Sequence, residues 1–229
     1  MITPRFVEFL IENQLRNSTG WFHEHHDEYE QVVRQPLIDL ATQLYDALGR
    51  IDPMLTDHRK PAASISRINR DTRYSTDKTI YKDHMWISIK RDKKAFPQYP
   101  EFFMGINPDS WEVGCGYYRM QPASQEIYRK MIVRDDPLFL KAQAALEKTD
   151  FVFWGTRRKR SLYPDQPPEK RQWLDLRDVA LVKESDDADL LFSDRFASYL
   201  TEACLSLADV YLFFLNVEER ARLEYDRKE

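Results

Sequence analysis

The N-terminal part of the chain shows apolar residues at the spacing of α-helices. Thr3 followed by Pro4 predicts an N-cap and the first residue of a helix, because this pair suits an opening turn. The polar residues 17–20 predict the end of that helix, and a second helix is expected to begin near Trp21. Pro36 is expected to kink or restart the second helix, since proline removes a backbone donor.

The middle of the chain changes to a period of two, which is typical of β-strands. Apolar and polar residues alternate over 85–90, and a short apolar run covers 102–106. Residues 107–110 form a turn sequence with proline in the favoured second position, and alternation resumes over 111–117. Two strands joined by so short a turn must be antiparallel neighbours. Glycines at alternate positions of the return strand leave one of its faces bare, so another backbone or a ligand can approach closely.

Helical patterns return in the second half of the chain. Ser124 is expected to cap one helix, and Asp136 followed by Pro137 is expected to start another. A polar, proline-bearing loop is expected over 157–171, and residues 174–182 are a weaker strand candidate.

Near the C-terminus, Asp194 is expected to cap a long apolar helix. Asn216 and Glu219 resemble a capping box, which predicts a separate charged helix over the last residues, 218–229. Because no internal repeat and no clean boundary is visible, we expect a single domain over residues 1–229. Helices first, strands in the middle and helices last favour an α+β fold. We expect a mostly antiparallel β-meander sheet, with helices from the N- and C-terminal regions packed around it.

Composition narrows the class of protein. Apolar residues make up 42% of the 229 residues, which is enough to build a core. The formal net charge is −4, whereas dedicated nucleic-acid binders carry an excess of basic charge. Nucleic acid is therefore not the expected partner. Cys115 and Cys204 lie far apart in apolar surroundings, and we expect them to be small buried side chains.

The N-terminal sequence does not have the pattern of a signal peptide. The longest strongly apolar run, residues 210–215, is too short to span a bilayer. We therefore expect a cytoplasmic protein that does not associate with a membrane, and the sequence does not predict its oligomeric state.

The densest polar stretch of the chain covers residues 67–82 and lies between two strand candidates. Its cations are Arg67, Arg70, Arg73, Lys78 and Lys82, and its carboxylates are Asp71 and Asp77. The stretch therefore stays cationic after both carboxylates are paired. A loop in this position can be held rigidly over a sheet edge, which is a common place for functional residues.

This stretch resembles the hallmark of the domain of unknown function 2461 family, whose members are mostly bacterial proteins of about this length. The hallmark reads R-x-x-R-D-x-R-[FY]-x-x-[DN]-K-x-x-Y. Its fixed positions are all met here, by Arg67, Arg70, Asp71, Arg73, Tyr74, Asp77, Lys78 and Tyr81. The resemblance implies membership of the family and supplies no activity.

The likeness extends over nearly the whole chain. Further family features are Trp21-Phe22 with Tyr29, residues 116–122, Arg129 with Ile132, and the leucine-rich C-terminal helix. Two positions depart from the family pattern. Ile80 stands where many members have a proline, and residues 17–20 stand where many carry paired asparagines. Both departures bear on loop geometry.

The motif suits the binding of a small anion, because arginine forks hold carboxylate or phosphate in bidentate geometry. The candidate ligand-binding residues are Arg67, Arg70, Asp71, Arg73, Asp77, Lys78, Tyr81 and Lys82. The alternative is a buried salt-bridge scaffold in a non-enzymatic structural or interaction protein. Under either interpretation, we expect Arg70 and Asp71 to be largely buried and hydrogen-bonded to each other or to shared partners, since buried ions need partners.

The sequence leaves open whether the protein is an enzyme. If the motif is catalytic, Asp71 is the expected base, and Tyr81 beside Lys82 is the expected acid. The chain carries no glycine-rich phosphate loop, nucleophile elbow or paired-cysteine motif. We therefore expect no cofactor and no metal.

Two further polar clusters have simple explanations. His23 and Asp27 share a helical face, which permits a metal pair but is more typical of a solvated surface. The basic run 157–160 lies beside Trp154 and Tyr163, and cations interleaved with aromatics can hold single-stranded nucleic acid. A solvated loop is the favoured interpretation of this run. Weak nucleic-acid binding through the motif and this run remains a further alternative.

Overall fold

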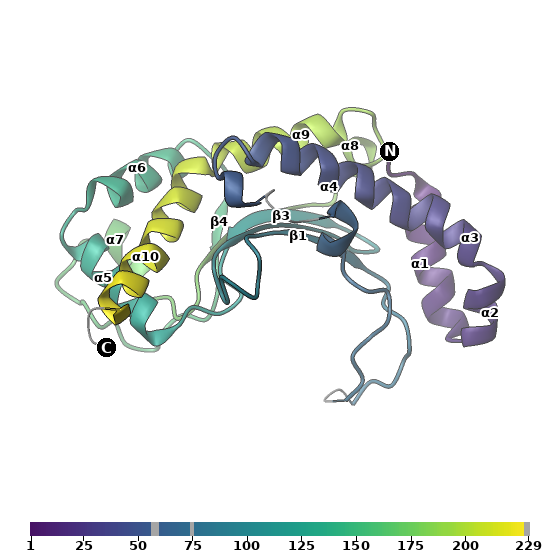
Figure 1. Cartoon of the computed structure of the whole chain (residues 1–229), viewed down its shortest axis with the longest axis horizontal. Coiled ribbons are helices and arrows are strands. Elements are labelled where there is room, and N and C mark those ends of the chain that lie inside the picture. The colour runs from purple at the N-terminus through teal and green to yellow at the C-terminus, as the bar shows by residue number, and fades with distance from the viewer. Residues whose placement is uncertain (56–59, 74–75, 227–229) are drawn as a thin grey trace. The chain divides into compact units, whose positions relative to one another are not determined.

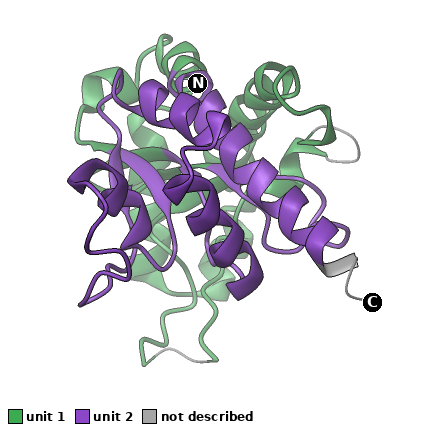
Figure 2. Ribbon diagram, turned by 90° about the vertical axis from the view of Figure 1, so that its left-hand side faces the viewer, with its two compact units in different colours: residues 1–89, 103–113, 184–202 green, residues 90–102, 114–183, 203–229 purple. Residues whose placement is uncertain are grey.

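The computed structural model describes residues 1–55, 60–73 and 76–226 (Figure 1). The chain divides into two compact units, which Figure 2 distinguishes by colour. Unit 1 comprises Met1–Ile89, Phe103–Val113 and Glu184–Glu202, and unit 2 comprises Lys90–Phe102, Gly114–Lys183 and Ala203–Glu229. The single domain expected over residues 1–229 stays a prediction.

Unit 1 begins with α1 (Pro4–Arg16), which starts at the predicted proline. Asn17 ends this helix in a left-handed conformation, with a φ of 46°. The next helix, α2 (Thr19–Glu24), begins earlier than the predicted Trp21, because the Ser18 hydroxyl accepts a hydrogen bond from the Trp21 N–H at 3.3 Å.

The following helical segment contains a π-helical turn. α3 (His26–Tyr29), the π-turn (Glu30–Arg34) and α4 (Gln35–Leu48) follow one another without a break in helical backbone. The N–H of Gln35 donates to the carbonyl of Glu30, which is the wider spacing of a π-turn. This turn lies directly before Pro36, which has no N–H to donate. The helix nevertheless continues through the proline into α4. Two short 3-10 turns follow, Pro53–Leu55 and Pro61–Ser64.

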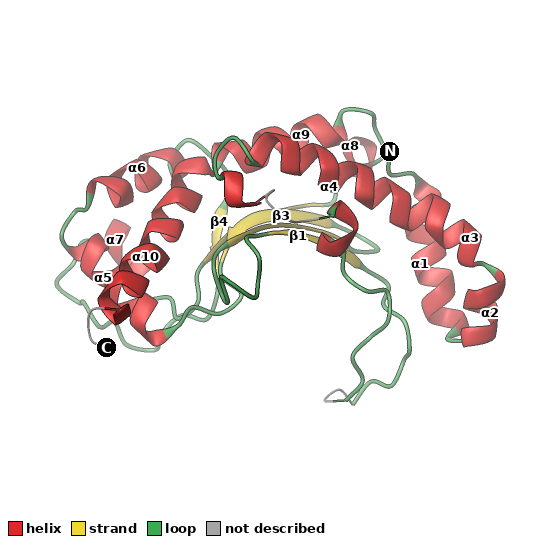
Figure 3. Cartoon of the chain, in the orientation of Figure 1, coloured by secondary structure: helices red, strands yellow, loops and turns green. Residues whose placement is uncertain are grey.

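The described strands form one five-stranded sheet in the order β1-β2-β3-β5-β4. The strands are β1 (Met85–Ile89), β2 (Glu101–Ile106), β3 (Trp111–Gly116), β4 (Val152–Trp154) and β5 (Ala180–Ser185). The predicted alternation is clearest in β1, where every second residue is buried. The predicted turn joins β2 to β3, and within it the N–H of Asn107 donates to the carbonyl of Ser110. Helices precede, interrupt and follow the strands, which confirms the α+β prediction (Figure 3).

An aromatic cluster around Trp111 fills part of the core of unit 1. The Trp111 ring makes edge-on contacts with Phe196 at 5.2 Å and Tyr199 at 5.5 Å. Its Nε1–H donates to the carbonyl of Asp187 at 3.1 Å, so the buried indole has a polar partner. Asp187 caps α8 (Ala188–Leu191), and Phe196 opens α9 (Phe196–Ser206).

Unit 2 contains α5 (Pro122–Val133), α6 (Pro137–Leu146), α7 (Pro168–Leu174) and α10 (Ala208–Asp226). Asp136 caps α6 as predicted, since its side chain accepts a hydrogen bond from the Leu138 N–H. The prediction for Ser124 is wrong. Gln121 is the N-cap of α5, and Ser124 lies inside that helix, where its hydroxyl donates to buried Glu218 at 2.7 Å.

The last helix differs from the prediction in two ways. The expected long apolar helix ends at Ser206 and a new helix, α10, begins at Ala208. Asn216 and Glu219 do not cap a separate charged helix, because α10 runs through both positions and packs on α5 and α6. Residues 227–229 of that predicted segment lie outside the described part of the chain. Within that part no single helix is long and apolar enough to cross a membrane, although the bent pair α9 and α10 together meets the same criterion.

The core of unit 2 gathers around Trp173. Its ring makes edge-on contacts with Phe139 at 5.6 Å and Phe153 at 4.9 Å.

Cys115 and Cys204 are buried free thiols, as predicted. Gly116 lies against β5, where a Cβ atom would come within 2.4 Å of the Ala180 Cα. The close approach is therefore to the neighbouring strand of the sheet, and the approach of a backbone or ligand to the bare face of β3 stays a prediction.

Two boundaries in unit 2 were predicted wrongly. The strand candidate over 174–182 becomes a strand only from Ala180, and α7 begins inside the predicted loop over 157–171. β4 was not predicted, because its short sequence leaves Val152 and Trp154 exposed and so lacks a buried alternation.

Candidate functional site

The motif at residues 67–82 lies on an extended arm within unit 1 that leads into β1 (Figure 1). The two sides of the arm form antiparallel bridges between Ile65 and Ile87 and between Asn69 and Tyr81. The Arg70 N–H donates to the Ile80 carbonyl at 2.8 Å, so the pairing reaches the middle of the motif. The backbone thus places the beginning and the end of the motif side by side.

Two ion pairs join cations and carboxylates of the motif. Arg73 holds Asp71 with both arms of its guanidinium, Nε to Oδ1 at 2.9 Å and Nη2 to Oδ2 at 2.7 Å. Arg70 Nη1 lies 3.0 Å from Asp77 Oδ2. Both carboxylates expected at this site are therefore engaged by arginines of the same motif.

The expected burial of Arg70 and Asp71 is only half present. The Asp71 side chain is 56% exposed, so for this residue the prediction is wrong. The Arg70 side chain is 25% exposed. The two residues are also not bonded to each other, because Arg70 pairs with Asp77 and Asp71 pairs with Arg73. The Asp71 carboxylate stays exposed to solvent, and its bidentate partner Arg73 is exposed as well.

The electrostatics of Asp71 argue against a role as a base. Hydrogen bonds from the side chain and backbone of Arg73 lower the pKa of the Asp71 carboxyl to about 2. A general base works best when its pKa lies near the working pH, so this carboxylate is too weak a base. The pKa of Asp77 is also lowered, chiefly by hydrogen bonds from Thr79 and to a smaller extent by Arg70.

The two lysines of the motif bond to main-chain carbonyls. Lys78 Nζ donates to Thr72 O at 2.7 Å, and Lys82 Nζ donates to Arg67 O at 2.9 Å. Burial lowers the pKa of the Lys82 ammonium, and the nearby charge of Arg70 lowers it further. Arg70 and Lys82 therefore form a partly buried pair of like charges.

One donor of this pair, Arg70 Nε, is buried without a hydrogen-bond partner in the described part of the chain. A buried donor without an acceptor is costly, and such groups are rare in folded proteins. The structure thus brings Arg70, Asp77 and Lys82 together, while Asp71 and Arg73 form a separate exposed pair and Arg67 is exposed.

The end of the motif is anchored to the N-terminal helices. Tyr81 is 2% exposed, and its ring lies 5.1 Å from that of Phe22. The side chain of Asn17 accepts a hydrogen bond from the Ile80 N–H at 2.6 Å. Tyr81 is therefore an anchor of the arm within the core. Tyr74, the remaining hallmark residue, lies outside the described residues.

A scan against protein-family models matches residues 5–213 to the family described as "Conserved hypothetical protein (DUF2461)". The chain belongs to the DUF2461 family. A search of curated proteins and a search of solved structures each found no match.

Two residues outside the motif that carry the sequence resemblance make defined contacts, one in each unit. Trp21 stacks on His25 at 4.0 Å in unit 1, and the His25 ring also bonds the Trp21 carbonyl. Arg129 belongs to α5 in unit 2, where it bonds Gln125. Defined polar contacts therefore occur outside the motif of residues 67–82 as well as within it.

The histidine cluster lies on α2 and α3. His26 Nε2 lies 3.9 Å from Glu30 Oε1, and His23 and Asp27 have solvent-accessible side chains. Within the described residues, no group of three or more His, Cys, Asp or Glu side chains is arranged to hold a metal ion. The cluster resembles a solvated helix face.

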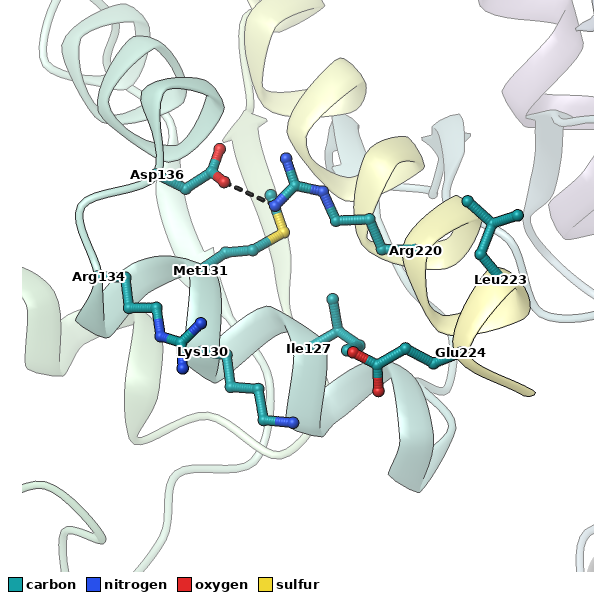
Figure 4. A pocket seen from close by; sticks show the side chains of 8 residues that line it. All are labelled: Ile127, Lys130, Met131, Arg134, Asp136, Arg220, Leu223 and Glu224. Carbon is teal, nitrogen blue, oxygen red and sulfur yellow. Dashed lines mark hydrogen bonds and ion pairs between the residues drawn. The ribbon is translucent and has the colours of Figure 1, made fainter. Parts of the chain in front are cut away.

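Unit 2 contains a cavity of about 330 Å³ between α5 and α10 (Figure 4). Arg220 pairs with Asp136 at 2.6 Å on its wall, and Lys130 and Arg134 contribute further positive charge. The lining comes from unit 2 alone, so the hallmark residues of unit 1 do not contribute to it.

Proposed function

We propose that this protein is cytoplasmic and binds a small anion, bearing phosphate or carboxylate, at the motif of residues 67–82. The observation that supports the proposal is the like-charge pair of Arg70 and Lys82. Both cations are partly buried, the repulsion between them contributes to the lowered pKa of Lys82, and Arg70 Nε has no acceptor. An anion beside this pair would relieve the repulsion and supply acceptors.

The charge balance of the motif supports the same proposal. Asp71 and Asp77 are already engaged by Arg73 and Arg70, so they leave Lys82 without a carboxylate partner in the described part of the chain. Its contact with the Arg67 carbonyl supplies a dipole but no opposite charge. An ammonium group offers three donors, and at least one is left for a ligand.

Isothermal titration calorimetry with inorganic phosphate and with acetate, at fixed ionic strength, tests this proposal. We expect saturable binding by the wild-type protein and a loss of about tenfold or more in affinity for Arg70→Gln and Lys82→Gln, since a charge-assisted hydrogen bond typically accounts for that much. Arg50→Gln is the matched control, because Arg50 is an exposed cation of unit 1 outside the arm. Equal affinity in all three variants would refute the proposal.

The second candidate function is a structural or interaction role, in which the motif is a salt-bridge scaffold. The two ion pairs and the bond from Asn17 to Ile80 support it, because they fix the course of the arm. This alternative predicts that no anion raises the melting temperature beyond a general salt effect. A ligand at about 100 times its dissociation constant would stabilise the fold by roughly 2.7 kcal/mol, so melting curves separate the two functions.

Nucleic-acid binding is the weakest of the three hypotheses. The net charge of −4 opposes it, and phosphate contacts weaken steeply with added salt. We expect weak or no binding of labelled single- and double-stranded oligonucleotides at physiological salt. Submicromolar affinity under that condition would overturn this ranking.

A further inference from the structure

A second arginine pair lies in unit 2, where Arg129 of α5 and Arg158 of the segment after β4 contact the same glutamine. Arg129 Nη2 donates to Gln125 Oε1 at 2.6 Å, and Arg158 Nη2 donates to the same oxygen at 3.4 Å. The two guanidinium groups therefore lie next to each other across one neutral acceptor. Their spacing of 29 residues places them on separate elements that the fold brings together.

The cluster is held in place by its surroundings. Gln125 Nε2 donates to the Met120 carbonyl at 3.2 Å, which turns its oxygen toward the arginines. The backbone of Arg158 is fixed by a bond from its N–H to the Asp175 carbonyl at 2.7 Å, and neighbouring Arg157 bridges Leu176. Both cations are thus positioned by contacts that do not neutralise them.

The positive charge of the pair is not balanced by a carboxylate. In the described part of the chain, neither Arg129 nor Arg158 forms an ion pair, and Arg158 Nε is buried without an acceptor. An amide oxygen accepts two hydrogen bonds but carries no charge. Both residues are partly exposed as a whole, so part of each side chain is accessible to solvent.

The pKa of Arg129 is also affected by this arrangement. Burial lowers the pKa of the Arg129 guanidinium, and the neighbouring charge of Arg158 lowers it further. Holding two cations together without an anion costs free energy in the folded protein, and a bound anion would recover that free energy.

We propose that Arg129, Arg158 and Gln125 form a binding site for a phosphate dianion, either inorganic phosphate or the phosphate group of a small monoester. Two guanidinium groups match a group that carries nearly two negative charges and three strong acceptor oxygens. A monocarboxylate offers one charge and two oxygens, so it satisfies this pair less well. The site is independent of the function proposed for the motif in unit 1.

Two-dimensional ¹H–¹⁵N NMR of the arginine Nε–H groups tests the site directly. Inorganic phosphate and methyl phosphate, titrated at fixed ionic strength, are expected to shift the Arg158 Nε–H signal in a saturable way, because that donor gains an acceptor. Arg158→Gln identifies the signal. Arg129→Gln is expected to weaken binding by about tenfold or more. Arg160→Gln is the matched control, since it removes an exposed charge of the same basic run.

A second variant tests the site while retaining both arginines. Gln125→Glu places a carboxylate between the two guanidinium groups and so supplies the missing negative charge. We expect it to raise the melting temperature and to abolish the response of the Arg158 signal to phosphate. Gln172→Glu, at an exposed position of α7, adds the same charge away from the pair and is expected to change neither property.

The outcomes separate cleanly. A saturable response that is lost in Arg129→Gln and Gln125→Glu but kept in Arg160→Gln supports the site, and it does so whether or not Arg70→Gln changes binding at the unit 1 motif. Binding of methyl phosphate as well as inorganic phosphate supports the monoester as a ligand source, and binding of inorganic phosphate alone supports the free ion. An unsaturable response, an equal loss of the response in Arg160→Gln and Arg129→Gln, or a stronger response to acetate than to phosphate would overturn the proposal.

Discussion

Asn17 accepts a hydrogen bond from the main-chain N–H of Ile80 at 2.6 Å, across a sequence separation of 63 residues. Asn17 is also the left-handed residue that ends α1, with a φ of 46°. The contact therefore ties the motif of residues 67–82 to the end of α1.

We expect Asn17→Gly to lower the free energy of unfolding by about 0.5–1 kcal/mol, because glycine keeps the left-handed conformation and removes only the acceptor. Asn17→Ala should cost more, since alanine is also strained at a positive φ. Urea denaturation followed by circular dichroism measures both. Ile80→Pro removes the donor, so the double variant Asn17→Gly with Ile80→Pro should lose less than the sum of the single variants. Strict additivity would show that the contact contributes nothing.

Lys82 provides a direct readout of anion binding at the motif. Its pKa is lowered in the free protein by burial and by Arg70, and a bound anion favours the charged ammonium. We expect saturating phosphate to raise the pKa of Lys82, measured by NMR titration of the lysine side-chain signals. Lys60, an exposed lysine of unit 1 before the arm, is the internal reference and should not respond. A parallel change in both residues would indicate a general salt effect.

Asp71 should be dispensable for folding. Its carboxylate is exposed and its partner Arg73 is 76% exposed, so solvent replaces the pair when it is broken. We expect Asp71→Asn to leave the midpoint of urea denaturation unchanged. A marked loss of stability would restore the interpretation of this pair as part of a buried scaffold.

Buried Glu218 should make stability fall with rising pH. Burial raises the pKa of its carboxyl, and the hydrogen bond from the Ser124 hydroxyl offsets only part of that effect. The folded protein therefore keeps this proton to a higher pH than the unfolded chain, whose pKa is about 4.3. The contribution to stability is full below the unfolded pKa and is lost as the pH rises through the folded pKa.

Glu218→Gln removes this dependence because the amide does not ionise. The variant should be more stable than the wild type at neutral pH, and the difference should vanish in acid. Urea denaturation at a series of pH values measures it, with Glu224→Gln, an exposed carboxylate of the same helix, as the control. If the free energy of unfolding changed between acid and neutral pH by the same amount in the wild type and in both variants, this account would be contradicted.

Gly116 should not tolerate a side chain. An added Cβ would lie 2.5 Å from the carbonyl oxygen of Val179, which belongs to backbone and cannot swing away. We expect Gly116→Ala to destabilise the fold by about 3 kcal/mol. Gly20→Ala is the opposite case, since its nearest neighbour would be the Ser18 hydroxyl at 3.7 Å and the residue lies in α2. That variant should gain about 0.5–1 kcal/mol. Thermal melting of both variants shows whether the loss of stability is specific to the close packing at Gly116 or follows any replacement of glycine by alanine.

Much of the fold was predictable because local patterns coincide with burial. The alternation over 85–90 became β1, and Asp136 with Pro137 opened α6 as expected. The failures arise where tertiary packing overrides a local pattern. Asn216 has the sequence signature of a helix start, yet packing of α10 on α5 and α6 keeps the helix continuous there.

The candidate site was predictable in composition but not in pairing. The sequence places Arg70, Asp71 and Asp77 in one motif, but it does not indicate that Arg70 pairs with Asp77 and Asp71 with Arg73. The hydrogen-bond partners of Asn17 and of Arg158 lie far away along the chain, so no local pattern encodes them. Asn17 had one signal in the sequence, since residues 17–20 predicted the end of the first helix.

The π-turn at Glu30–Arg34 has a consequence for how the chain can change length during evolution. A π-turn holds one residue more than the α-helical turn it replaces, so it is a place where a helix stores an insertion. Deleting one residue there would leave α3 and α4 with their own buried faces. The same deletion inside α4 would rotate every later side chain of the helix by about 100° and expose Leu44 and Leu48. The turn before Pro36 is thus the position in this helix where relatives of different length can be accommodated.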